Sequence, residues 1–219
     1  MNPRIAIINA SVLSIEPVMA AFMVAWPEAR LFNLVDDALS SDLTAAGEST
    51  AQLTARIGSL ADHAVLADAR AILYTCSAFG PAIDLVKRRI GIPVLAANEA
   101  MIDEALGAGS RLAVLATTAA ALPTICAEIE AAARARRLAP SVFPVHVPGA
   151  LDSLASGRID LHDAAIVEAA SGLGDCDVIL LGQFTMARAA AAVASRTGRK
   201  VLTSPTAAVT RLRSRCGAA

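Results

Sequence analysis

Cys76 is the side chain in this sequence best suited to acid–base or nucleophilic chemistry. It follows a strongly apolar stretch, stands between Thr75 and Ser77, and precedes a segment with helical character. A free thiol has a pKa of about 8.5, and the N-terminus of a helix lowers that value toward neutrality. We therefore expect Cys76 to be a functional thiol rather than a buried structural cysteine. The cysteines predicted to be structural or inert are Cys126, Cys176 and Cys216.

The backbone after Cys76 is expected to provide the electrostatic partner of the thiol. Amide N–H groups of Ser77, Ala78 and Phe79 would lie at the start of the helix, where such groups bind carboxylates and developing oxyanions. The hydroxyl groups of Thr75 and Ser77 add hydrogen-bond donors. These groups predict a binding site beside the thiol for a small carboxylate, or for the enolate formed from it.

Small polar residues also stand where other strands are expected to end, and with their neighbours they complete the candidate substrate-binding set. This part of the set consists of Asn9, Ser11, Thr117, Thr118, Gln183, Phe184 and Thr185. Such residues either contact carboxylate or amide groups of a substrate or cap the next helix, and we predict substrate contact. For Gln183 a second interpretation stays open, a loop residue that satisfies backbone groups. Its carboxamide donates and accepts hydrogen bonds but exchanges no proton at neutral pH.

The strands expected to position these residues are continuous apolar runs, with alanine-rich, helix-prone segments between them. The clearest runs cover residues 4–11, 71–77, 92–98, 111–118, 177–183 and 200–206, and two weaker runs cover residues 30–37 and 141–149. Apolar runs without alternation are typical of parallel sheets that are covered on both faces. The succession of strands and helices predicts an α/β protein.

An internal repeat divides the chain into two similar halves. One constant shift along the sequence superimposes three of the apolar runs without a gap. The matched pairs are Arg4 with Arg111, Ile72 with Ile179, and Pro93 with Lys200. The repeat predicts two lobes, residues 1–98 with 205–219 and residues 99–204, each with a short parallel sheet flanked by helices. The remaining strand of each half aligns only after a slip of a few residues.

The carboxyl ends of the strands are the expected place for a ligand, as in other open parallel sheets. If a pseudo-two-fold axis relates the two lobes, loops 76–79 and 183–186 form opposite walls of one cleft, with 9–11 and 117–118 alongside. The sequence therefore predicts that one substrate contacts loops from both lobes.

Composition and charge exclude several classes of protein. Of the 219 residues, 55% are hydrophobic and 18% are charged, which is enough apolar surface to exclude intrinsic disorder. A net charge of -1 and an aromatic content of 3% argue against a nucleic-acid partner. The longest uncharged run, residues 112–127, is too short and too polar to span a membrane. Without a CxxC pair or a convincing export signal, we expect a cytoplasmic protein with reduced thiols and no membrane partner.

No metal or cofactor site is predicted. The GAGSRL segment at 107–112 precedes its strand and lacks the third glycine of a dinucleotide-binding motif. His63, His146 and His162 are far apart in the sequence, and no cysteine spacing suggests zinc. The two lysines of the chain stand at positions that do not suit a Schiff base with pyridoxal phosphate.

Four segments make the chain resemble the aspartate/glutamate/hydantoin racemase superfamily, which also contains maleate isomerases and arylmalonate decarboxylases. They read TCSAFG around Cys76, GIPVLAANEAM at 91–101, RLAVLATT at 111–118 and VILLGQFTM at 178–186, and the resemblance covers essentially the whole chain. It implies two flavodoxin-like halves with the site between them, catalysis without a cofactor, and a homo-oligomer. It also implies two cysteines that exchange the proton at a carbon next to a carboxylate.

The resemblance also implies roles for individual residues. By position, Cys76 matches the first of the two cysteines. Asn9, Ser11, Thr117 and Thr118 match loop positions that contact the substrate. Family members with a single cysteine include decarboxylases that keep the second cysteine, whereas this chain keeps the first.

Gln183 stands where the family places the second cysteine. Racemisation needs a proton-transferring group on each face of the substrate, and neither Gln183 nor Thr185 is an effective one. We expect a racemase- or isomerase-like enzyme that acts on a small carboxylate through Cys76. Two alternatives stay open: a one-cysteine decarboxylase or lyase that protonates one face only, and a non-catalytic protein that binds a small carboxylate. The missing phosphate loop disfavours a flavodoxin-like nucleotide binder.

Overall fold

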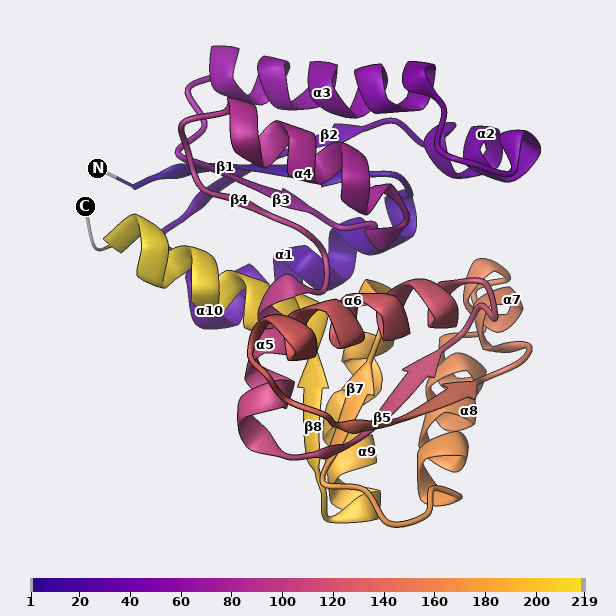
Figure 1. Ribbon diagram of the computed structural model, residues 1–219. Helices are drawn as coiled ribbons and strands as arrows, with labels where there is room; N and C mark the ends of the chain where they lie inside the picture. Colours follow the sequence, from indigo (N-terminus) through magenta and orange to yellow (C-terminus); the bar gives the residue numbers. More distant parts are fainter. Residues whose placement is uncertain (1, 218–219) are drawn as a thin grey trace. The chain divides into compact units, whose positions relative to one another are not determined.

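The computed structural model describes residues 2–217, and the chain divides into two compact units. The first unit consists of Met1–Ala97 and Ala208–Ala219, and the second unit consists of Asn98–Ala207. The divisions fall at 97/98 and 207/208, where the repeat predicted 98/99 and 204/205. Each unit contains a four-stranded parallel sheet, with strand orders β2-β1-β3-β4 and β6-β5-β7-β8 (Figure 1).

Helices cover both faces of the sheet in the first unit. The strands are β1 (Arg4–Asn9), β2 (Arg30–Val35), β3 (Ala71–Tyr74) and β4 (Val94–Leu95). The helical elements are η1 (Val12–Ser14), α1 (Ile15–Ala25), α2 (Leu39–Ala46), α3 (Ala51–Leu66), η2 (Ser77–Phe79), α4 (Gly80–Arg89) and α10 (Ser204–Gly217), which begins in the second unit. Ile8 and Tyr74 pack with α3 and α4 on one face, and α1 and α10 lie on the other (Figure 1).

The second unit repeats this arrangement. Its strands are β5 (Arg111–Ala116), β6 (Ser141–His146), β7 (Val178–Leu181) and β8 (Lys200–Thr203). Its helical elements are α5 (Glu99–Ala108), α6 (Ala121–Ala135), α7 (Ala150–Ala155), α8 (Ile159–Ser171), η3 (Phe184–Ala189) and α9 (Ala190–Thr197). Leu112 and Leu180 pack against α5 and α6, whereas Leu115 and Leu181 pack against α7, α8 and α9. Burial on both faces explains why the central strands β5 and β7 are continuous apolar runs.

All eight predicted strands are present, and each ends earlier than predicted. The runs at 71–77 and 177–183, for example, end as strands at Tyr74 and Leu181. The polar residues that close each run belong to the loops, where the chain leaves the sheet to start a helix. Cys76 and Gln183 therefore lie two residues beyond the last paired residues of β3 and β7.

The repeat persists in the backbone hydrogen bonds. Just past the end of the first sheet, the Thr75 amide donates to the Ile8 carbonyl at 3.0 Å. At the same place in the second unit, the Gly182 amide donates to the Leu115 carbonyl at 2.9 Å. Both pairs keep the constant shift that places Arg4 on Arg111, so the two sheets end in the same register.

The slipped strand of each half has a definite offset. The Arg30 amide donates to the Pro3 carbonyl at 2.8 Å, and the Ser141 amide donates to the Ser110 carbonyl at 2.7 Å. Pro3 and Ser110 keep the constant shift, whereas the same shift would place Arg30 on Arg137, four positions before Ser141. The connection before β6 is therefore longer than the connection before β2 by these four positions, and the strand pairing itself is the same in both units.

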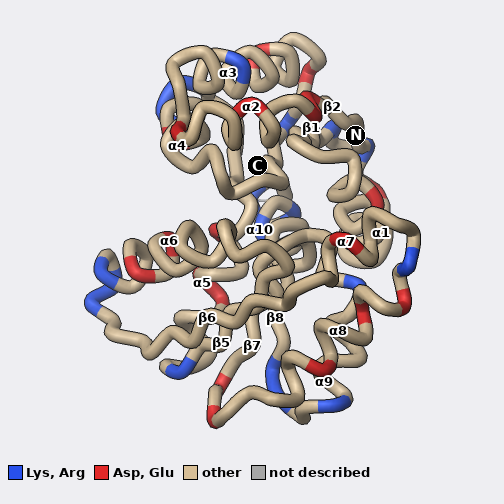
Figure 2. The backbone as a smooth tube through the Cα atoms, turned by 90° about the vertical axis from the view of Figure 1, so that its right-hand side faces the viewer, with Lys and Arg blue, Asp and Glu red and all other residues tan. Residues whose placement is uncertain are grey.

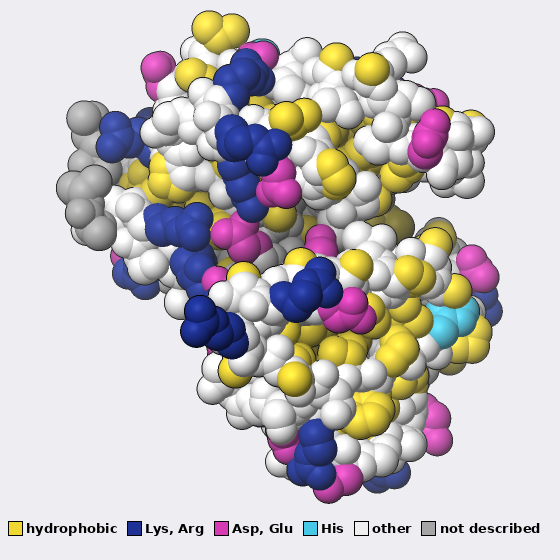
Figure 3. All heavy atoms as spheres, in the orientation of Figure 1, with side chains coloured by type: hydrophobic (Ala, Val, Ile, Leu, Met, Phe, Trp, Pro, Cys, Tyr) yellow, Lys and Arg dark blue, Asp and Glu magenta, His cyan; other side chains and the backbone are white. Residues whose placement is uncertain are grey.

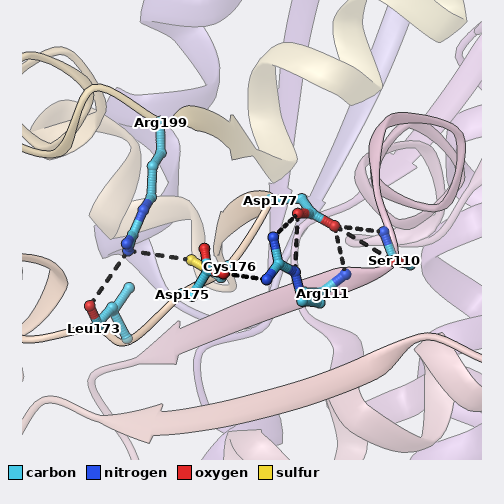
Figure 4. Close-up of polar contacts among 7 residues, drawn as sticks. All are labelled: Ser110, Arg111, Leu173, Asp175, Cys176, Asp177 and Arg199. Carbon is cyan, nitrogen blue, oxygen red and sulfur yellow. Dashed lines mark hydrogen bonds and ion pairs between the residues drawn. The ribbon is translucent and has the colours of Figure 1, made fainter.

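An ionic cluster joins β5 and β7 at their amino ends (Figure 4). The Asp177 carboxylate accepts hydrogen bonds from the amides of Ser110 and Arg111, both at 2.9 Å, and from the Arg111 guanidinium, which also pairs with Asp175. The Arg111 side chain and these amides hold the pKa of Asp177 well below its usual range. A Cβ on Gly109 would lie 2.4 Å from the Asp177 Cβ, so the glycine of the GAGSRL segment permits this close approach.

Charged residues are spread over helices and turns of both units (Figure 2). Basic side chains gather on the face of the first unit shown in Figure 3, where α4 ends with Lys87, Arg88 and Arg89. Cations at this end of a helix are favourable because they oppose the negative end of the helix dipole. Among residues 2–217, no helix has the length and apolarity needed to cross a membrane.

Candidate active site

Cys76 lies directly after β3, where the chain turns into a helical run. Its backbone is extended, with φ −120° and ψ 125°, and it precedes the 3-10 turn η2, which leads directly into α4. Pro81 stands in the first turn of α4, a position where its missing N–H costs no helical hydrogen bond. The Cys76 side chain is partly exposed and forms no disulfide. The thiol is thus accessible at the amino end of a helical segment.

A buried polar network lies beside Cys76 in the first unit. Asn9 is completely buried, and its Oδ1 accepts hydrogen bonds from Thr75 Oγ1 at 3.0 Å and Ser14 Oγ at 2.9 Å. Asn9 Nδ2 donates to Asn33 Oδ1 at 3.0 Å. Every polar group of the Asn9 amide therefore has a protein partner. Because Thr75 directly precedes Cys76, this network holds in place the residue next to the thiol.

Ser14 and Ser11 have different hydrogen-bonding roles at the start of the first helical segment. Ser14 is buried within the network, and its Oγ also lies 2.8 Å from the Ser11 carbonyl oxygen, which shares the same hydroxyl proton with Asn9. Ser11 is partly exposed, and its Oγ caps η1 by accepting from the Leu13 amide at 3.3 Å. Ser11 was among the predicted site residues and Ser14 was not. Ser14 stands directly before α1 without capping it through its side chain, so no local sequence pattern indicated its part in the network.

The predicted polar residues of the second unit come together around Gln183. Gln183 Oε1 accepts from the Thr117 amide at 2.6 Å and from Thr117 Oγ1 at 2.8 Å. Gln183 Nε2 donates to Thr118 Oγ1 at 3.3 Å. Thr117 is buried, whereas Thr118 and Gln183 are partly exposed. A single side chain thus connects the loops that follow β5 and β7.

Gly182 allows the helix α6 to pack against the end of β7. A Cβ at this position would lie 2.6 Å from Ile125 Cδ1 and 3.1 Å from the Leu115 carbonyl oxygen. Gly182 was not among the predicted site residues, although a glycine at the end of a buried strand often marks a close approach of neighbouring groups. Because Gly182 has no side chain, Ile125 of α6 can lie directly beside the backbone that leads to Gln183.

The segment that follows Gln183 is anchored to α8. Arg188, in η3, donates from Nε to Asp163 Oδ2 at 2.9 Å. Asp163 Oδ1 is 2.7 Å from Nδ1 of His162, a completely buried side chain. Of the predicted residues in η3, Phe184 is buried at 3% exposure and Thr185 is partly exposed. Side-chain contact with a ligand therefore suits Thr185 better than Phe184.

Other side chains that could do acid–base or nucleophilic chemistry include buried or partly buried thiols and carboxylates paired with arginine. Burial raises the pKa of the Cys126, Cys176 and Cys216 thiols, which favours their neutral form over the nucleophilic thiolate. Asp36 is bound by the Arg56 guanidinium at 2.5 and 2.8 Å. Within the described residues, no group of three His, Cys, Asp or Glu side chains is arranged to hold a metal ion.

Known proteins resemble this chain over almost its full length. A sequence profile of the family described as Asp/Glu/Hydantoin racemase matches residues 5–212, and no curated protein sequence matches the chain. Allantoin racemase from Pseudomonas fluorescens shares the fold, with 21% identity, a TM-score of 0.66, and coverage of 96% of this chain and 89% of its own.

Two further solved structures have the same fold. Glutamate racemase from Francisella tularensis subsp. tularensis, in complex with D-glutamate, has 14% identity and a TM-score of 0.71, covering 97% of this chain and 80% of its own. A mutant of arylmalonate decarboxylase has 18% identity and a TM-score of 0.67, covering 98% of this chain and 94% of its own. The profile match spans far more than half of the sequence. The chain belongs to the Asp/Glu/hydantoin racemase family.

Proposed function

We propose that this protein is a racemase- or isomerase-like enzyme that moves a proton at a carbon next to a carboxylate, with Cys76 as the acid–base group. The observation that carries the proposal is the position of Cys76, a partly exposed thiol between a buried strand and a helical run, in a chain of the racemase family. The substrate is a small carboxylate, and no cofactor takes part.

The proposed chemistry uses groups from the Cys76 loop. The Cys76 thiolate removes the proton from the carbon next to the carboxylate, and the electron pair moves into an enediolate. The amides of Ser77 and Ala78, at the start of the helical run, stabilise the added negative charge, as backbone donors do at developing oxyanions. In a racemisation, water protonates the opposite face of the same carbon, and the Cys76 thiol gives its proton back to water. Thr75 is a positioning residue, because Asn9 and Ser14 already engage its hydroxyl.

A second candidate function is decarboxylation or a lyase reaction in which only one face of the substrate is protonated. It is favoured by Gln183, which stands at the repeat-related position of Cys76 and does not ionise at neutral pH. In that reaction the carbon–carbon bond to the leaving carboxylate breaks, carbon dioxide departs, and the Cys76 thiol protonates the enediolate that remains. Water then restores the proton of the thiol.

The experiment that tests both functions uses carboxylates suggested by the family description and by the names of the relatives. The protein is incubated in D₂O with glutamate and aspartate enantiomers and with phenylmalonate. Proton NMR follows exchange at the reacting carbon, polarimetry follows configuration, and carbon dioxide release follows decarboxylation. We expect at least one acid to react, and we expect Cys76→Ala to lower that rate by about 10²–10⁴-fold, the usual contribution of a positioned acid or base.

The matched control is Cys126→Ala, which removes a thiol from α6 whose pKa is raised by burial. This variant should keep the wild-type rate. A reaction with every acid absent, together with a Cys76 thiol that reacts with iodoacetamide no faster than free cysteine between pH 6 and 9 (roughly the range around the free thiol pKa), would support the non-catalytic binding protein instead.

A further inference from the structure

The hydrogen bonds of Gln183 define which way its carboxamide points. The Thr117 amide lies 2.6 Å from Gln183 Oε1, and a backbone N–H can only donate. The atom that faces it must therefore be the oxygen of the carboxamide. A second donor, Thr117 Oγ1, reaches the same oxygen at 2.8 Å. The opposite orientation would place the Gln183 NH₂ group against a donor, so the oxygen faces Thr117 and the nitrogen faces away from it.

This orientation leaves hydrogen-bond donors at the carboxyl end of the second sheet. Gln183 Nε2 carries two hydrogens and donates one to Thr118 Oγ1 at 3.3 Å. Within residues 2–217 its second N–H has no hydrogen-bond partner, and the side chain is partly exposed. The Thr118 hydroxyl accepts from Gln183 and keeps its own proton for another acceptor. Neither group ionises near neutral pH, so both can bind an oxygen but cannot move a proton.

We propose that Gln183 is a specificity-determining residue that binds an acceptor oxygen of the substrate, a carboxylate or carbonyl oxygen, through Nε2 with help from the Thr118 hydroxyl. This inference rests on the proposed function, which supplies the class of ligand.

The composition of the chain offers a direct readout. Gln183 and Gln52 are its only glutamines, and Gln52 lies exposed on α3. Labelling glutamine side chains with ¹⁵N gives two NH₂ signal pairs, which Gln183→Glu and Gln52→Glu assign. We expect phenylmalonate, L-glutamate or allantoin to shift the Gln183 pair and leave the Gln52 pair unchanged. A Gln183 pair that responds to none of these three probes would overturn the proposal.

Substitution separates ligand binding from a purely structural role. Gln183→Glu keeps an oxygen for the Thr117 amide and replaces the donor Nε2 with an acceptor. We expect it to weaken binding of the responding acid by at least about tenfold, because a hydrogen bond to a charged group is lost and like charges are brought together. Gln52→Glu adds the same charge and should leave binding unchanged. Equal affinity of Gln183→Glu and wild type would show that Gln183 only holds Thr117.

Two readouts separate this inference from the proposed function. A ligand-induced shift of the Gln183 pair without any Cys76-dependent exchange would keep the binding role and reject the proposed catalytic function. Exchange without such a shift would do the reverse.

Discussion

The carboxyl ends of the two sheets have the same backbone and different side-chain chemistry. Thr75 and Gly182 occupy matching places, each one residue before the candidate functional side chain. In the first unit the Thr75 hydroxyl enters a buried polar network around Asn9. In the second unit Ala116 stands at the place of Asn9, and the side chain of Ile125 approaches Gly182. The space beside Thr75 is thus filled by hydrogen-bonded polar groups, and the space beside Gly182 by an apolar side chain.

A shared hydrogen-bond register does not determine the chemistry of a sheet end. The residue after Thr75 is a thiol that can accept and return protons, whereas the residue after Gly182 is a carboxamide held by Thr117. The first sheet end is therefore suited to proton transfer and the second to oxygen binding. Substitutions can remove this difference between the two sheet ends or disturb the contacts that maintain it.

Making the two functional positions identical should have the largest effect. Cys76→Gln gives both sheet ends a carboxamide, and we expect the rate of proton exchange to fall by about 10²–10⁴-fold because no group remains to take the proton. Deuterium exchange in D₂O measures the rate with the acid that the wild-type protein processes. The far-ultraviolet circular dichroism spectrum should stay unchanged, since the position is partly exposed. A variant that keeps full activity would contradict the role of the thiol.

Removing the centre of the polar network should destabilise the first unit. Asn9→Leu leaves the hydroxyls of Thr75 and Ser14 and the amide of Asn33 without this partner. A hydrogen bond contributes about 1 kcal/mol to stability, and the substitution removes three of them, so we expect a loss of about 3 kcal/mol in the free energy of unfolding. Urea denaturation measures the change.

The control for this variant is Asn2→Leu at an exposed position, which should change the free energy of unfolding by no more than about 0.5 kcal/mol. If Asn9→Leu were as stable as this control, the network would not be what holds the residue before Cys76.

Adding a side chain at the apolar sheet end should have a smaller effect. Gly182→Ala puts a methyl group 2.6 Å from Ile125 Cδ1 and 3.1 Å from the Leu115 carbonyl oxygen. The Ile125 side chain can move, but the carbonyl oxygen is part of the sheet. We expect a cost of about 1–2 kcal/mol in urea denaturation, typical of an overpacked core.

Gly174→Ala is the matched control, because a Cβ at that position meets no neighbouring atom within 4 Å. We expect the double variant Gly182→Ala with Ile125→Ala to lose less free energy of unfolding than the two single variants added together. The second substitution removes the side chain nearest the added methyl group. Fully additive effects of the two substitutions would mean that Ile125 is not what limits the space at Gly182.

The amino ends of the sheets differ as well, and that difference should depend on pH. Arg70 of the first unit occupies the place of Asp177, so only the second unit has the Asp177–Arg111 cluster. The Arg111 side chain lowers the pKa of Asp177 in the folded protein. A carboxylate whose pKa is lowered by folding stabilises the protein above its unfolded pKa, about 3.9, and this contribution is lost as the pH falls through the folded pKa.

We expect wild type to be more stable than Asp177→Asn between about pH 5 and 7, with the advantage shrinking below about pH 4. The urea midpoint of both proteins, measured across this range, gives the difference. Asn2→Ser, at an exposed position in the first unit, removes no ionisable group and should show no such trend. A wild-type advantage that grows as the pH falls would have the wrong sign for this cluster.

The apolar pattern was sufficient to predict the eight strands and the two parallel sheets. It was not sufficient to predict where each strand ends. Residues such as Thr75 suit a strand by residue type, although they belong to the loop that follows it. The constant shift between the halves also identified the matching places of Cys76 and Gln183. Gly182 escaped notice because its importance comes from Ile125, which lies on a helix from a distant part of the sequence.

The sequence by itself determined the order of strands and helices, the repeat, and the presence of a thiol at one sheet end and a carboxamide at the other. These features are local, since apolar periodicity and residue type are written along the chain. Only the tertiary structure decided that Asn9 is a buried support and that Gln183 turns its oxygen toward Thr117. Their partners are far away in the sequence, and hydrogen-bond direction exists only after folding has brought donor and acceptor together.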